Sequence, residues 1–170
     1  DELKKVDELC QAEITYNFHG NEEKIGKEQI RNWVRRDGDG KLYVSRDGAY
    51  NYLCELANKY DTVNSYRSFW SSRGYEITLD PGTYGWGTDV DTEINLLMED
   101  INNKRKASRD PAYYMTPYNN LDPNSPDDIG FTYVEIDLSG QYMWFYKNGE
   151  VFASTSITSG TMSTGHGTPS

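Results

Sequence analysis

The chain has 170 residues, of which 36% are hydrophobic and 26% are charged, and its formal net charge is −10. This length suits one ordinary domain, or a small domain joined to part of another. An acidic chain lacks the clustered basic side chains that displace counterions from phosphates, so we expect no nucleic-acid partner. The apolar stretches fall far short of the roughly 20 residues that cross a bilayer, and no signal sequence opens the chain. Membrane anchoring is therefore expected only through a segment upstream of Asp1.

Hydrophobic periodicity predicts helices and short strands in the first 60 residues. Ile14, Tyr16 and Phe18 alternate with polar residues as in a half-buried strand, and Gly20-Asn21 favours a hairpin turn after them. The apolar face is broadest between residues 46 and 60. In chain order we expect a helix at 1–12, a hairpin from 14 to 25, a helix at 27–34, a Gly-rich turn at 37–40, a strand at 41–45 and a helix at 46–60.

The next segment predicts a strand pair and a second strong helix. Residues 66–70 and 75–79 are expected to pair as strands, and Asp80-Pro-Gly82 closes that unit. The helix is predicted from the spacing of apolar residues, and Thr88, three residues before Asp91, resembles a capping arrangement that places its start near Thr88. The apolar positions of this helix are Val90, Ile94, Leu97, Met98 and Ile101.

Proline and small polar residues then mark a boundary. Four of the six prolines lie between residues 108 and 130, which predicts an extended segment followed by a surface loop. Beyond it Val134, Ile136 and Leu138 alternate with acidic residues, and Asn148-Gly149 is typical of a type I′ hairpin. The sequence therefore predicts a β-meander after the boundary.

The meander carries a family resemblance. The run Tyr133-Val-Glu-Ile-Asp-Leu-Ser-Gly-Gln-Tyr-Met-Trp-Phe-Tyr-Lys-Asn-Gly-Glu150 resembles the opening strands of the L,D-transpeptidase (YkuD-type) catalytic domain. The segment Ser159-Gly-Thr-Met-Ser-Thr-Gly-His-Gly-Thr-Pro169 resembles the glycine-containing loop of that family. Residues 14–109 resemble the peptidoglycan-binding domain that precedes the catalytic domain in many Gram-positive members. The best local matches are 14–18 and 84–86, together with 128–130 at the junction.

The resemblance implies an α+β protein in three parts. Residues 1–120 would form a peptidoglycan-binding, substrate-side accessory domain of helices and short antiparallel sheets. Residues 121–130 would form a linker, and residues 131–170 the N-terminal part of a truncated, all-β catalytic domain. The implied setting is extracellular, in the cell wall or anchored on the outer face of the membrane. The implied partner is peptidoglycan, through its stem peptide or its glycan.

The family cross-links stem peptides by acyl transfer through a cysteine thiolate, which also needs an activating histidine and donors to the oxyanion. Its Ser-His-Gly-Cys signature does not occur in this sequence, so we expect this chain to be inactive, with no catalytic residue of its own. Cys10 and Cys54 are not expected to act as nucleophiles. A disulfide between them is an open alternative. Cys54 lies on an apolar helical stripe with Tyr50, Leu53 and Ala57, which favours its interpretation as a small buried hydrophobe. We interpret His166 as a loop residue and His19 as structural or solvent-facing.

Tyr84-Gly85-Trp86 is the candidate substrate-binding segment. Glycine between two rings allows a tight turn that exposes one of them for stacking, although packing in a β-core is the alternative. Asp37-Gly-Asp-Gly-Lys41 is interpreted as a plain turn, because a calcium-loop register would put Arg35 and Arg46 at ligand positions. We expect no metal and no cofactor. The alternative functions are a non-catalytic wall-binding module and a spacer.

Overall fold

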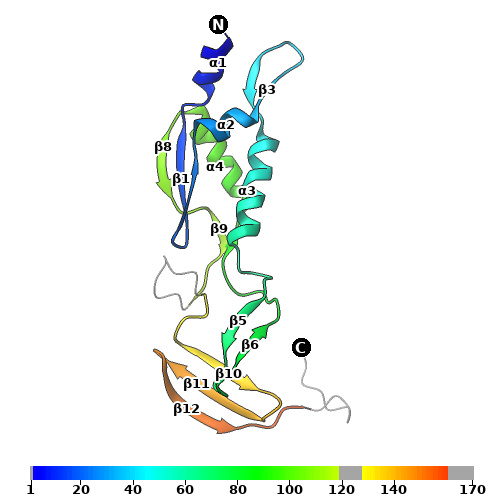
Figure 1. Cartoon of the computed structure of the whole chain (residues 1–170), viewed down its shortest axis with the longest axis vertical. Helices are drawn as coiled ribbons and strands as arrows, with labels where there is room; N and C mark the ends of the chain where they lie inside the picture. Colours follow the sequence, from blue (N-terminus) through cyan, green and yellow to red (C-terminus); the bar gives the residue numbers. More distant parts are fainter. Residues whose placement is uncertain (1, 119–127, 161–170) are drawn as a thin grey trace.

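The computed structural model describes residues 2–118 and 128–160. His166, most of the predicted linker and nearly all of the glycine-containing loop lie outside these residues. Figure 1 shows an elongated α+β molecule, with helices and a three-stranded sheet at the N-terminal end and a second three-stranded sheet at the other. The predicted fold class is therefore confirmed.

The first sheet has the strand order β2-β1-β8 and forms one wall of the core. Ile14, Tyr16 and Phe18 on β1 are fully buried, because alternate side chains of a strand point to the same face. β1 pairs with β2 in the predicted antiparallel hairpin, and with β8 in a parallel ladder. The bounds are Glu13–Phe18 for β1, Asn21–Ile25 for β2 and Lys106–Arg109 for β8.

Helices cover the buried face of this sheet, and the two long ones contribute Leu53, Leu56, Ile94 and Leu97 to the apolar core. Ser45 caps α3 by accepting a hydrogen bond from the Gly48 amide, and Asp89 caps α4 by accepting one from Thr92. The predicted cap at Thr88 is wrong, because Thr88 is buried and donates to Asp61 instead. The bounds are Glu2–Leu9 for α1, Lys27–Trp33 for α2, Arg46–Tyr60 for α3 and Val90–Asn102 for α4.

The buried residues of this region include a polar network as well as an apolar cluster. Glu93 on α4 is fully buried, and its carboxylate accepts hydrogen bonds from the Tyr16 hydroxyl (2.5 Å) and the Ala112 amide (2.7 Å). Arg109 pairs with Glu93 at 2.8 Å and with Asp100 at 3.0 Å. Each charge therefore has a partner, as burial requires.

Two pairs of short strands flank the long helices. β3 (Val34–Arg36) pairs with β4 (Leu42–Val44) across the predicted turn, where the Asp37 carboxylate accepts hydrogen bonds from the backbone amides of Asp39 and Lys41. β7 (Gly87–Thr88) pairs with β9 (Tyr113–Met115), which the sequence did not predict.

The predicted strand pair and meander are both present. β5 (Arg67–Trp70) pairs with β6 (Glu76–Leu79), and this hairpin lies between α3 and the meander in Figure 1. The second sheet has the order β10-β11-β12, with bounds Tyr133–Asp137, Tyr142–Lys147 and Glu150–Ser156. Asn148 and Gly149 both have positive φ, 52° and 83°, as a type I′ turn requires.

One of the two cysteines differs from the prediction. Cys10 is buried in the apolar core, whereas Cys54 on α3 is only half-buried, and both are free thiols. Cys54 is therefore not the core residue that the stripe predicted. Burial raises the pKa of the Cys10 thiol, which disfavours the nucleophilic thiolate.

Candidate functional site

The segment Tyr84-Gly85-Trp86 connects β6 to β7, and its two rings have different surroundings. The Tyr84 side chain is 39% exposed, and its hydroxyl accepts a hydrogen bond from the Tyr118 amide at 2.9 Å. Trp86 is buried between His19, at a centroid distance of 5.0 Å, and Tyr113, at 4.9 Å. Tyr84 is thus the exposed ring that the tight turn predicted, while Trp86 belongs to the interior.

Gly85 allows three other side chains to meet. Its φ of +136° lies in a region that favours glycine. A Cβ atom at this position would collide with Thr62, Arg67 and Asp128. A side chain at residue 85 would therefore displace the polar groups that gather over this glycine.

Those polar groups form a buried junction between distant parts of the chain. Asp128 is 4% exposed. Its carboxylate accepts hydrogen bonds from the Thr62 hydroxyl at 2.5 Å and from Arg67 Nε and Nη2 at 3.0 and 2.5 Å. Arg67 also donates to the Tyr84 carbonyl at 2.6 Å. The structure thus brings the 84–86 and 128–130 segments together through Arg67, which sequence reasoning did not single out.

A second set of polar contacts holds the tip of the β5–β6 hairpin against the meander. The Glu135 carboxylate accepts hydrogen bonds from the Ser72 amide at 3.0 Å and the Ser72 hydroxyl at 2.5 Å. Arg73 pairs with Asp137 at 2.9 Å, and its guanidinium lies over the Trp144 ring at 5.0 Å. The alternation of β10 therefore turns its acidic residues toward the hairpin.

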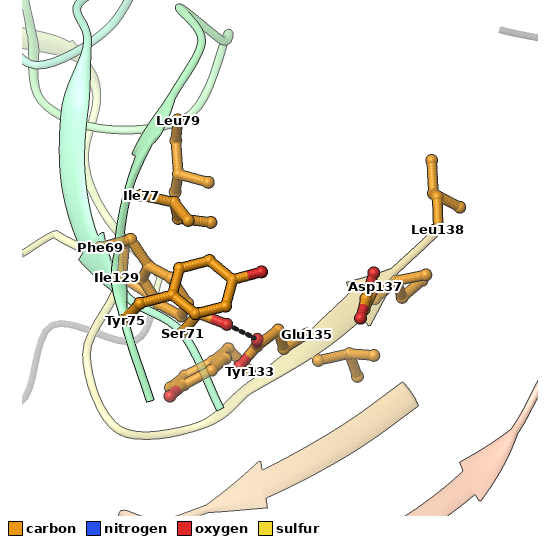
Figure 2. Close-up of a pocket in the computed structure, with 12 residues that line it drawn as sticks. Phe69, Ser71, Tyr75, Ile77, Leu79, Ile129, Tyr133, Glu135, Asp137 and Leu138 are labelled. Carbon is orange, nitrogen blue, oxygen red and sulfur yellow. Dashed lines mark hydrogen bonds between the residues drawn. The ribbon is translucent and has the colours of Figure 1, made fainter. Parts of the chain in front are cut away.

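Two clefts flank the hairpin. The larger, of about 520 Å³, lies between β6 and β10, and Figure 2 shows Tyr75, Ile77 and Leu79 on one side and Leu138 on the other. The smaller, of about 380 Å³, lies between β5 and the start of the meander. Each cleft is walled by residues from both sides of the linker.

Burial shifts the pKa values of His19, which stacks on Trp86, and of Asp61. The pKa of His19 is lowered, chiefly because burial disfavours the imidazolium, and its Nε2 lies 2.9 Å from the Tyr60 carbonyl. Burial likewise raises the pKa of Asp61, whose carboxylate accepts hydrogen bonds from Thr88. These features place His19 in a structural role, in agreement with the sequence interpretation.

The described residues contain no group of three or more His, Cys, Asp or Glu side chains arranged to hold a metal ion. Across residues 2–118 and 128–160, no helix has both the length and the apolar character that a membrane span requires. What the site presents is an exposed ring at Tyr84 and two clefts beside the hydrogen-bonded junction.

Comparisons with known proteins agree with this arrangement. Two solved structures match with a TM-score of 0.67 and 30% identity over 96% of this chain: the Ldtfm–avibactam carbamoyl enzyme and a cysteine-to-serine mutant of the L,D-transpeptidase of Enterococcus faecium. The chain spans 62% and 63% of their respective lengths. A search of curated proteins gives no match. The family model described as a putative peptidoglycan binding domain matches residues 1–109, and the chain therefore belongs to that family.

Proposed function

We propose that this chain is the peptidoglycan-binding, substrate-side region of an extracellular L,D-transpeptidase, followed by the opening strands of its catalytic domain. The likeness to L,D-transpeptidases at 30% identity over 96% of the chain is the observation that carries this proposal. This likeness extends over nearly the whole chain. The family match over residues 1–109 supports peptidoglycan as the partner.

In this proposal the chain binds and positions, and the acyl transfer belongs to the whole enzyme. Acyl transfer needs a reactive thiol and an activating base, and the 170 residues contain no Ser-His-Gly-Cys sequence. We therefore expect no turnover of a tetrapeptide stem by this chain. Its contribution is to hold the meander in a fixed orientation through the Arg67–Asp128 and Ser72–Glu135 contacts.

The test is sedimentation of the purified chain with insoluble cell wall. We expect weak binding that rises with salt, because a net charge of −10 is repelled by anionic wall polymers and salt screens that repulsion. Tyr84→Ala should reduce the pelleted fraction about twofold to tenfold, the range that stacking on one aromatic ring contributes. Trp86→Ala is a poor probe, because loss of a buried ring disturbs the packing around His19 and Tyr113.

The matched control is Tyr43→Ala. Tyr43 lies on β4 and is 44% exposed, close to the 39% of Tyr84. Tyr43→Ala therefore removes a ring of similar exposure at a position outside the 84–86 segment. If the native chain remains in the supernatant at every salt concentration, the binding proposal is wrong. The spacer function, which the elongated arrangement in Figure 1 also suits, then becomes the better account.

A further inference from the structure

The smaller cleft beside the β5–β6 hairpin is an aromatic groove. Five aromatic side chains line it, and the other lining residues are a serine, an isoleucine and two glycines. Its volume of about 380 Å³ lies within the range of small-ligand pockets. The five aromatic residues are Phe69, Trp70, Phe131, Tyr133 and Tyr146.

Three of these rings are fixed by one another and two are open to solvent. Tyr133 stacks on Tyr146 at a centroid distance of 4.8 Å, and Phe69 meets Tyr133 edge-on at 5.6 Å. Trp70 is 69% exposed and Phe131 is 54% exposed. Large rings so exposed around a concave surface are characteristic of a binding site. The groove thus has a rigid floor and two accessible rings.

The groove is also uncharged. None of its lining residues is Asp, Glu, Lys or Arg, although 26% of the chain is charged. The neighbouring cleft, by contrast, contains Glu135 and Asp137. An uncharged aromatic surface favours a neutral ligand with apolar faces, because a charged ligand would lose its hydration without gaining a partner.

Polar atoms are nevertheless available in the groove. The Tyr146 hydroxyl lies 2.7 Å from the Ser72 hydroxyl, so its position is fixed by the hairpin. Ser68 supplies a second hydroxyl, which donates to Glu76. A pyranose ring has the matching character, since its C–H faces are apolar and its edges carry hydroxyl groups.

We propose that the aromatic groove binds a neutral sugar of the peptidoglycan glycan, with Trp70 and Phe131 stacking on its ring. This inference rests on the proposed function and names the part of peptidoglycan that this surface recognises. Free stem peptides are disfavoured here because they carry carboxylates. Because the groove is built from both sides of the linker, a bound glycan would contact the hairpin and the start of the meander together.

The test is a saturation-transfer NMR titration of the whole chain with chitotetraose, a neutral oligomer of N-acetylglucosamine. We expect Trp70→Ala and Phe131→Ala each to weaken binding about twofold to tenfold, as the loss of one stacked ring predicts. Tyr75→Ala is the matched control, because Tyr75 is 55% exposed but lines the other cleft. Circular dichroism melting checks that each variant remains folded, and Trp70→Phe should restore part of the binding if the ring itself is needed.

The outcomes separate this inference from the proposed function. If the native chain sediments with cell wall but chitotetraose does not bind, or binds all variants equally, the groove assignment is wrong and the wall-binding proposal stands. Two further results would overturn the groove assignment, because each would show another occupant. One is displacement of chitotetraose by a tetrapeptide stem, and the other is a dimer in sedimentation equilibrium that Trp70→Ala dissociates. If neither wall nor oligosaccharide binds, both proposals fail.

Discussion

The two sheets of this protein are stabilised in different ways. The sheet β2-β1-β8 buries Ile14, Tyr16 and Phe18 completely against α3 and α4. The sheet β10-β11-β12 has no buried residue, and Val134 and Ile136 on its edge strand are more than half exposed. Side-chain contacts from Glu135 and Asp137 to the β5–β6 hairpin fix its position instead. The comparison shows that the first region is stabilised mainly by apolar burial, while the second is held to its neighbour by polar bonds and by contacts between partly exposed aromatic rings.

The largest expected effect is on the first region. Leu97 on α4 is fully buried, so Leu97→Ala should lower the free energy of unfolding by about 2–5 kcal/mol through lost contacts and a cavity. Ile136 on β10 is 52% exposed, so Ile136→Ala should cost under about 1 kcal/mol. Urea denaturation of both variants measures the difference. Equal losses would show that the second sheet has an apolar core of its own.

The junction should give the next effect, and it should act on the second region alone. Asp128→Asn removes the charge that Arg67 pairs with at 2.5 Å in a buried position. Leaving Arg67 without its charged partner should lower the free energy of unfolding by about 2–3 kcal/mol. This is less than the usual cost of breaking a buried ion pair, because Arg67 keeps its hydrogen bond to the Tyr84 carbonyl. Amide exchange should accelerate in β11 and remain unchanged in α4.

Asp80→Asn is the control for that measurement. Asp80 is exposed in the turn after β6, so the substitution changes the net charge equally without touching the junction. If both variants leave the exchange of β11 unaltered, the Arg67–Asp128 pair does not couple the two regions. If α4 also loses protection, the two sheets unfold as one unit and the comparison fails.

A smaller effect is expected at the hairpin tip. Glu135→Gln keeps an acceptor for Ser72 but removes the charge that strengthens both hydrogen bonds. A double-mutant cycle with Ser72→Ala should give a coupling energy of about 1 kcal/mol. Glu150→Gln, at an exposed position on β12, serves as the matched charge control. A coupling energy near zero would mean that Arg73 and Asp137 alone hold the tip.

Much of the local structure was predictable, because its signals lie in short stretches of sequence. The bounds predicted for the third helix, 46–60, agree with α3, and the Asn148-Gly149 turn has the predicted positive φ values. The cap of α4 was misplaced by one residue, since both Thr88 and Asp89 are capable caps. The tertiary hydrogen bond from the Thr88 hydroxyl to Asp61 decides between these two residues.

Long-range pairing was not predictable from these patterns. The parallel ladder joins Tyr16 of β1 to Arg109 of β8, and a single strand carries no signal for so distant a partner. Glu93 and Asp100 on α4 are charged and lie outside the apolar pattern that predicted this helix, yet both are buried with Arg109. The candidate site follows the same pattern: the sequence draws attention to the Tyr84–Trp86 segment, but the positions of Arg67 and Trp70, and which of the two rings is exposed, depend on tertiary contacts.

The smallest expected effect is a pH dependence of stability that comes from the first region. Burial lowers the pKa of His19 from its ordinary value of 6.5, so below that pH the unfolded chain binds a proton that the folded chain does not. The stability that His19 contributes is therefore complete above pH 6.5 and is lost as the pH falls toward the folded pKa. One such group changes the unfolding free energy by at most about 1.4 kcal/mol per pH unit.

The variant His19→Asn isolates this contribution. Residue 19 has a φ of 39°, a conformation that asparagine tolerates, so the backbone can be kept while the titrating ring is removed. Loss of the stacked ring beside Trp86 lowers stability at every pH, so the slope between pH 7 and 5 is the readout and not the absolute value.

Asp61 works in the opposite direction, because burial raises its pKa from 3.8 and its ionisation in the folded state becomes unfavourable as the pH rises. That contribution stays in both chains, so the native curve should fall more steeply toward pH 5 than the His19→Asn curve. Parallel curves would mean that His19 is protonated as readily in the folded chain as in the unfolded one, and that its burial beside Trp86 is not maintained in solution.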